Sequence, residues 1–137
     1  MRVAVVYFPA SKRDKLSTLS QALARGIERQ GHQVDVVDGV RDSQAKLTTY
    51  QYIALGSEQT NLFGGKLPNK VKEFLAGAGM IAGKKSCAFI LRHAIGERRT
   101  LSRLMGAMER EGMFLRVSHS FTKEEEAEAV GTDLTIE

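Results

Sequence analysis

A short, mostly basic segment separates the first apolar run of the chain from the first helical pattern. It consists of Ser11, Lys12, Arg13, Asp14 and Lys15. A hydroxyl, three cations and the backbone N–H groups at the start of a helix are groups that bind an anion such as a phosphate. These residue types therefore predict an anion-binding turn, although they leave a second interpretation open.

The second interpretation is a turn that binds nothing. Asp14 would place a negative charge beside the anion, and the segment has no glycine to let the backbone approach a ligand closely. The three cations would then be ordinary solvated charges. In the binding interpretation the same cations supply the positive charge, and Ser17 or Thr18 offers a donor at the start of the helix.

Two later polar segments also contain residues that could contact a ligand. The first, after an apolar run at 52–55, contains Ser57, Thr60, Phe63 and Gly64. An aromatic ring at position 63 could stack on a flat ligand or cover the edge of a sheet. The second contains Arg92 and His93, which could neutralise an anion, contact an acidic partner or form a plain surface pair.

Other kinds of site find no support in the sequence. Cys87 lies in the apolar run 86–91, which favours a buried structural role. No cysteine and histidine residues have the spacing of a metal site, and no nucleophile, base and orienting group stand together. We therefore expect no metal site and no hydrolase or transferase chemistry.

Apolar runs alternate with helical patterns along the chain. The runs that predict strands are 3–8, 34–37, 52–55, 87–91 and 113–117. Apolar residues at three- and four-residue spacing predict helices over 16–27, 71–75 and 101–108. This layout predicts an α/β fold with a doubly wound parallel sheet, whose ligands bind beyond the carboxyl ends of the strands. The loops at that edge are 8–16, 56–67 and 91–100.

The order of these segments is similar to that of a known family. "VVYF" and "LSQALARGIERQGHQVDVVD" resemble the first strand, first helix and second strand of flavodoxins. "YIALGSEQTNLFGGKLPNKVKEFL" resembles their third strand, second ligand loop and third helix. The resemblance covers residues 2–118 and implies one flavodoxin-like domain over 1–137. Its sheet would have five parallel strands in the order 2-1-3-4-5, with helices on both faces and FMN in the three loops.

The resemblance also implies which residues would contact FMN. They are Ser11, Lys12, Arg13, Asp14, Lys15, Ser57, Thr60, Phe63, Gly64, Arg92 and His93. The family's first loop reads approximately Ser/Thr-x-Thr-Gly-x-Thr, and this chain retains only the leading serine. Glu58 stands where the family commonly has proline, and Arg92 and His93 stand where small or aromatic residues are usual.

The C-terminal end departs from the family pattern as well. Flavodoxins typically end in a full helix that covers one face of the sheet, whereas the helical piece expected here, 123–129, is short and mostly charged. We therefore expect a C-terminal helix that is short or missing, followed by a polar tail from about residue 130. An uncovered face would invite a homodimer or a partner subunit.

Length and charge narrow the class of protein further. The 137 residues, 42% of them hydrophobic, suffice for one domain with a core, and the formal net charge is +4. A basic surface favours an acidic protein partner. No apolar stretch reaches the ~18 residues of a membrane span, and no leader pattern is present, so we expect a cytoplasmic protein. Nucleic-acid binding ranks low, because no basic motif is interleaved with aromatic residues.

Two functions remain after these arguments. The first is an FMN-binding protein that acts in electron transfer, with three loops in the expected places. The alternative is a flavodoxin-like module that has lost FMN and binds an acidic protein partner or another phosphorylated ligand.

Overall fold

The computed structural model describes residues 1–58, 70–92 and 96–137. Its elements in chain order are β1 (Arg2–Phe8), α1 (Arg13–Glu28), β2 (Gln33–Asp38), β3 (Tyr52–Ser57), α2 (Lys70–Ala76), β4 (Lys85–Leu91), α3 (Glu97–Arg110), β5 (Phe114–Phe121) and α4 (Glu124–Asp133). Within the described residues no helix has the length and apolar character needed to cross a bilayer.

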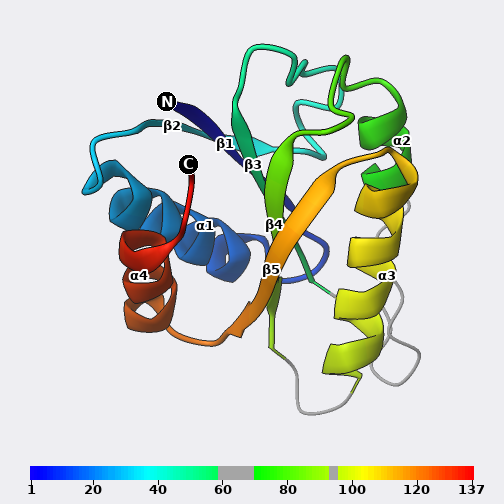
Figure 1. Ribbon diagram of the computed structural model, residues 1–137. Helices are drawn as coiled ribbons and strands as arrows, with labels where there is room; N and C mark the ends of the chain where they lie inside the picture. Colours follow the sequence, from blue (N-terminus) through cyan, green and yellow to red (C-terminus); the bar gives the residue numbers. More distant parts are fainter. Residues whose placement is uncertain (59–69, 93–95) are drawn as a thin grey trace.

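The five strands form one parallel sheet in the order β2-β1-β3-β4-β5. Helices α1 and α4 cover one face, and α2 and α3 cover the other (Figure 1). The predicted doubly wound fold is therefore confirmed, including the strand order that the family resemblance implied.

The side chains of strand β1 are apolar on both faces, which allows helices to cover the strand from both sides. Its alternate residues Val3, Val5 and Tyr7 belong to the apolar cluster beneath α1, whereas Ala4, Val6 and Phe8 belong to the cluster beneath α2 and α3. All six side chains are buried. A strand covered on both faces needs apolar residues at every position, which is why the valine-rich run predicted it.

Helix α1 begins earlier than its apolar pattern indicated. It starts at Arg13, and Lys12 occupies the N-cap position without a side-chain hydrogen bond to the helix. Ser17 lies inside the helix, where its Oγ is 3.3 Å from the Tyr7 hydroxyl. The expectation that Ser17 or Thr18 caps the helix start is therefore wrong, because the basic turn itself forms the first helical residues.

The C-terminal helix is present, although it is short. Helix α4 packs along α1 (Figure 1). Arg25 of α1 bonds the carboxylates of Glu124 and Glu128 at 3.3 and 3.0 Å. The helix extends four residues beyond the expected end at 129. Leu134 and Ile136 after it are buried in the apolar cluster with α1, so the expected polar tail contributes two side chains to the core.

Strand β5 forms one edge of the sheet and has an irregular register. Its pairing with β4 shifts between Ser86 and Cys87, so that Leu115 and Val117 are consecutive partners and Arg116 is the extra residue. An extra residue of this kind is a β-bulge, which bends a strand and increases its twist. Arg116 and Val117 are both exposed.

Candidate functional site

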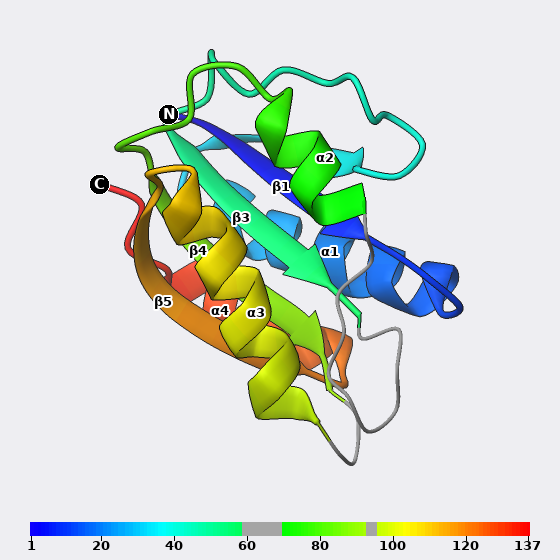
Figure 2. The same cartoon turned by 90° about the vertical axis from the view of Figure 1, so that its right-hand side faces the viewer.

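The candidate site lies where the parallel strands end. Phe8 at the end of β1 pairs with Ser57 of β3, and Ser57 pairs with Ile90 of β4. The residues that follow these strands therefore gather at one edge of the sheet. Figure 2 shows β3 and β4 running toward the end of the molecule at which α3 begins.

A buried carboxylate occupies the turn between β1 and α1. Glu58, directly after β3, is only 1% exposed. Its Oε1 accepts hydrogen bonds from the backbone N–H groups of Ala10 at 2.5 Å and Lys12 at 2.9 Å, and its Oε2 lies 3.1 Å from the Lys12 nitrogen. The neighbouring Ser57 hydroxyl donates to the Glu58 carbonyl oxygen at 3.0 Å. The anionic group bound in the turn before α1 is thus a side chain of the protein, the Glu58 carboxylate.

This arrangement does not fit the phosphate that the family resemblance implies. The N–H groups of Ala10 and Lys12 are donors that a phosphate in this turn could use, and both are bonded to Glu58. Two unit charges of like sign ~4 Å apart repel by about 4 kcal/mol at an effective dielectric constant of about 20. A phosphate in this turn would compete with the Glu58 carboxylate for these two donors and would be repelled by its charge.

Arg13 is engaged elsewhere. Its Nη1 donates to Oδ2 of Asp38 at the end of β2. The Asp38 carboxylate is largely buried, and its Oδ1 also accepts the backbone N–H groups of Val40 and Arg41, each at 3.0 Å. This ion pair ties the start of α1 to the turn after β2, so the Arg13 charge is neutralised within the fold.

The other members of the basic turn face different surroundings. Ser11 and Lys12 are exposed. Asp14 and Lys15 line a shallow hollow with Thr18 and with residues 122–125, where the chain enters α4. The predicted cluster therefore divides among the turn, the end of β2 and the start of α4, and it does not converge on one anion.

Arg92, directly after β4, is held by two carboxylates. Its guanidinium lies 3.8 Å from Glu97 and 3.5 Å from Glu126, and Nη2 donates to the Ser120 carbonyl oxygen at 3.0 Å. The N–H and hydroxyl of Thr122 bond the Glu126 carboxylate and lower its pKa. The positive charge of Arg92 is thus balanced by the protein itself.

Four predicted site residues, Thr60, Phe63, Gly64 and His93, lie outside the described residues. Aromatic stacking by Phe63 and neutralisation by His93 remain predictions. Ser57 is buried at the carboxyl edge as expected. Sequence reasoning noted Glu58 only as a departure from the family's usual proline and missed its contact with the turn before α1; its signal was a carboxylate placed directly after a fully buried strand.

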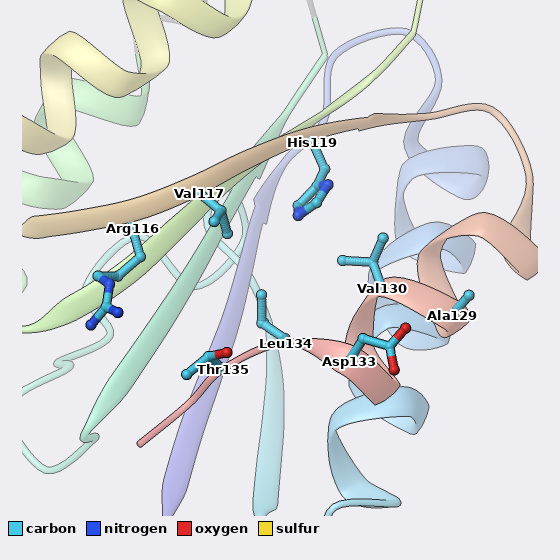
Figure 3. A pocket seen from close by; sticks show the side chains of 8 residues that line it. All are labelled: Arg116, Val117, His119, Ala129, Val130, Asp133, Leu134 and Thr135. Carbon is cyan, nitrogen blue, oxygen red and sulfur yellow. The ribbon is translucent and has the colours of Figure 1, made fainter.

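Two other features were considered as sites. Cys87 is buried in β4, and burial raises the pKa of its thiol to about 12, so the nucleophilic thiolate does not form at neutral pH. A hollow of about 500 Å³ lies between β5 and the end of α4, where Val117, His119, Val130 and Leu134 line it (Figure 3). Its polar lining residues are Arg116, His119, Asp133 and Thr135, and no hydrogen bond between these side chains is found among the described residues.

Comparisons with known proteins agree with the topology. No family model matches the chain, and no curated protein matches it. Among solved structures, a flavodoxin from the domain Archaea is 20% identical with a TM-score of 0.71, covering 98% of this chain and 96% of its own. Oxidised flavodoxin 1 from Bacillus cereus is 18% identical with a TM-score of 0.71, and the match covers 96% of this chain and 95% of the flavodoxin.

A third similar structure is a short-chain flavodoxin associated with a non-canonical PDU bacterial microcompartment. It is 11% identical with a TM-score of 0.72, covering 98% of this chain and 97% of its own. The chain therefore has the flavodoxin-like fold along its whole described length.

Proposed function

We propose that this chain is a flavodoxin-fold binding module that does not use the phosphate of FMN and recognises an acidic protein partner. The observation that carries the proposal is the buried Glu58 carboxylate, which takes up the N–H donors of Ala10 and Lys12. A fold does not fix a function. The Glu58 carboxylate in this turn is a specific reason to expect that the chain has the flavodoxin-like fold without using the phosphate of FMN.

The basic surface of α3 supports the acidic partner. Arg99, Arg103 and Arg110 are exposed, and their spacing places them on one side of the helix over about 16 Å. None of the three forms an ion pair with another residue in 1–58, 70–92 or 96–137. Unpaired cations in a row attract acidic partners and speed their association.

The first test compares FMN with riboflavin. Because the turn is filled, the wild-type protein should bind both flavins equally weakly, and flavin fluorescence should show no quenching that depends on the phosphate. Quenching by FMN at micromolar protein, with riboflavin much weaker and with strong dependence on salt, would refute an FMN-independent module.

The second test addresses the partner surface with a defined probe, a fluorescent glutamate-rich peptide. Its anisotropy is measured with the wild-type protein, with R99E/R103E/R110E, and with K15E/K72E/R116E, which changes the net charge equally at exposed positions on other elements. The α3 variant should lose about tenfold in affinity and the control much less. Equal losses would mean that only net charge matters.

The competing candidate is an FMN-binding protein that acts in electron transfer. The likeness to flavodoxin structures over 96–98% of the chain favours it. Bound FMN would supply one-electron chemistry there. A flavin absorption band in the purified protein, together with phosphate-dependent quenching, would support this candidate over the binding module.

A further inference from the structure

We infer that Glu58 is a built-in ligand of the turn between β1 and α1, and that it closes an anion site which the turn would otherwise offer to a phosphate. The inference deepens the proposed function and rests on it. It assigns Glu58 the role of an autoinhibitory contact and identifies phosphate and phosphate monoesters as the ligand class it excludes.

The contact differs from an ordinary helix cap. A usual cap is a side chain at the N-cap position that bonds its own helix. Here the N-cap residue Lys12 makes no such bond, and the acceptor comes from the end of β3, 46 residues away along the chain. The carboxylate therefore reaches the turn as a separate group, in the way that a bound anion would.

The turn is also arranged around the carboxylate. The N–H of Ala10, three residues before α1 begins, and that of Lys12 both point at Oε1. Backbone N–H groups of nearby residues that converge on one point form an anion-binding concavity, and the 16-residue helix α1 adds its positive dipole end. With Glu58 only 1% exposed, the concavity is filled.

Two substitutions of Glu58 test the effects of its charge and of its volume separately. Glu58→Ser shortens the side chain and frees both donors, so the site becomes open. Glu58→Gln removes the charge but keeps the volume, and its amide oxygen still accepts the N–H of Lys12. The serine variant should therefore gain phosphate binding, while the glutamine variant should not.

The experiment measures the melting temperature of the full chain with inorganic phosphate, using chloride at equal ionic strength as the reference. The wild-type protein and E58Q should show no stabilisation specific to phosphate. E58S should melt at a lower temperature in chloride and recover with phosphate, with a gain in phosphate affinity of about tenfold or more. FMN should then bind E58S more tightly than riboflavin does.

Three results would overturn the inference. Phosphate could stabilise the wild type as much as E58S, or E58S could fold and show no gain. If E58S does not fold, amide hydrogen exchange of the wild type decides: Ala10 and Lys12 should be protected, and exchange at the rate of open loop amides would contradict the contact. A wild type that binds neither flavin, together with an E58S variant that gains nothing, leaves the proposed function intact and removes only this inference.

Discussion

At the scale of single residues, several charged side chains of this protein bind its own backbone. Lys84 is the clearest example beside Glu58, because its Nζ donates to the carbonyl oxygens of Leu47, Thr48 and Tyr50 at 2.8, 2.5 and 2.7 Å. Burial lowers the pKa of this amine. The bonds fasten the loop between β2 and β3 to the start of β4.

Replacing Lys84 with methionine should destabilise the protein. The change keeps most of the apolar stem and removes three charge-assisted hydrogen bonds, so we expect a loss of about 2 kcal/mol in the free energy of unfolding. Urea denaturation measures it, with exposed Lys72→Met as the matched control. An unchanged midpoint for K84M would show that the three carbonyl groups are equally well solvated without it.

The sequence could not distinguish bound cations from free ones. Lys84 and Lys85 are adjacent in the sequence, yet Lys85 bonds the Glu137 carbonyl oxygen and Lys84 bonds the carbonyl oxygens of another loop. Every residue has a carbonyl group, so composition gives no sign of which cation will find one. The same reason explains why the division of the turn 11–15 among several partners was not predicted.

At the scale of elements, the contact between α1 and α4 depends on two glycines. A methyl group on Gly26 would lie 2.7 Å from the Thr132 nitrogen and 2.9 Å from the Gly131 carbonyl carbon, and one on Gly131 would lie 3.0 Å from Gly26 Cα. The two backbones therefore approach without side chains between them. Gln30 adds hydrogen bonds to the carbonyl oxygens of Gly131 and Leu134 at 2.7 and 2.8 Å.

Gly26→Ala should weaken this helix pair even though alanine favours helices. The methyl group meets backbone atoms that have little freedom to move, so the free energy of unfolding should fall by about 2–3 kcal/mol. Gly106→Ala is the control, because nothing lies within 4 Å of the corresponding methyl position in α3. It should raise stability by up to about 1 kcal/mol. A similar effect of both substitutions would contradict the close approach.

The sequence pattern underestimated the length of α4 because the partners of its charged residues lie far away along the chain. The acidic run at its start suggested a solvated piece, whereas Glu128 pairs with Arg25 and Arg29 of α1, and Arg25 also pairs with Glu124. The partners of these acids lie about a hundred residues earlier in the chain. Such pairs become visible only when the helices are placed side by side.

At the scale of the whole molecule, the two apolar layers account for the success of the fold prediction. Strands β1, β3 and β4 are buried on both faces, so their sequences are apolar over most of their length and stand out. The end of the chain has no such signal. Leu134 and Ile136 are two isolated apolar residues in a polar segment, and the burial of both was missed.

Ile136→Ala tests whether the C-terminal segment belongs to the cooperative core. Ile136 is 2% exposed within the α1 and α4 layer, and removing its side chain should reduce the free energy of unfolding by about 2–4 kcal/mol. Val36→Ala in β2, which is 37% exposed, should cost much less. If I136A unfolded at the wild-type urea concentration, the segment would be detached from the core in solution.

The bulge in β5 has a consequence for how this protein behaves at high concentration. An open strand edge is a template on which a second chain can extend the sheet, and such growth leads to aggregates and fibrils. The extra residue Arg116 breaks the even hydrogen-bond spacing of that edge and places a charge on it, beside exposed Phe114 and Val117. Crowded copies of the chain should therefore resist joining strand to strand, and a homodimer would use a different surface.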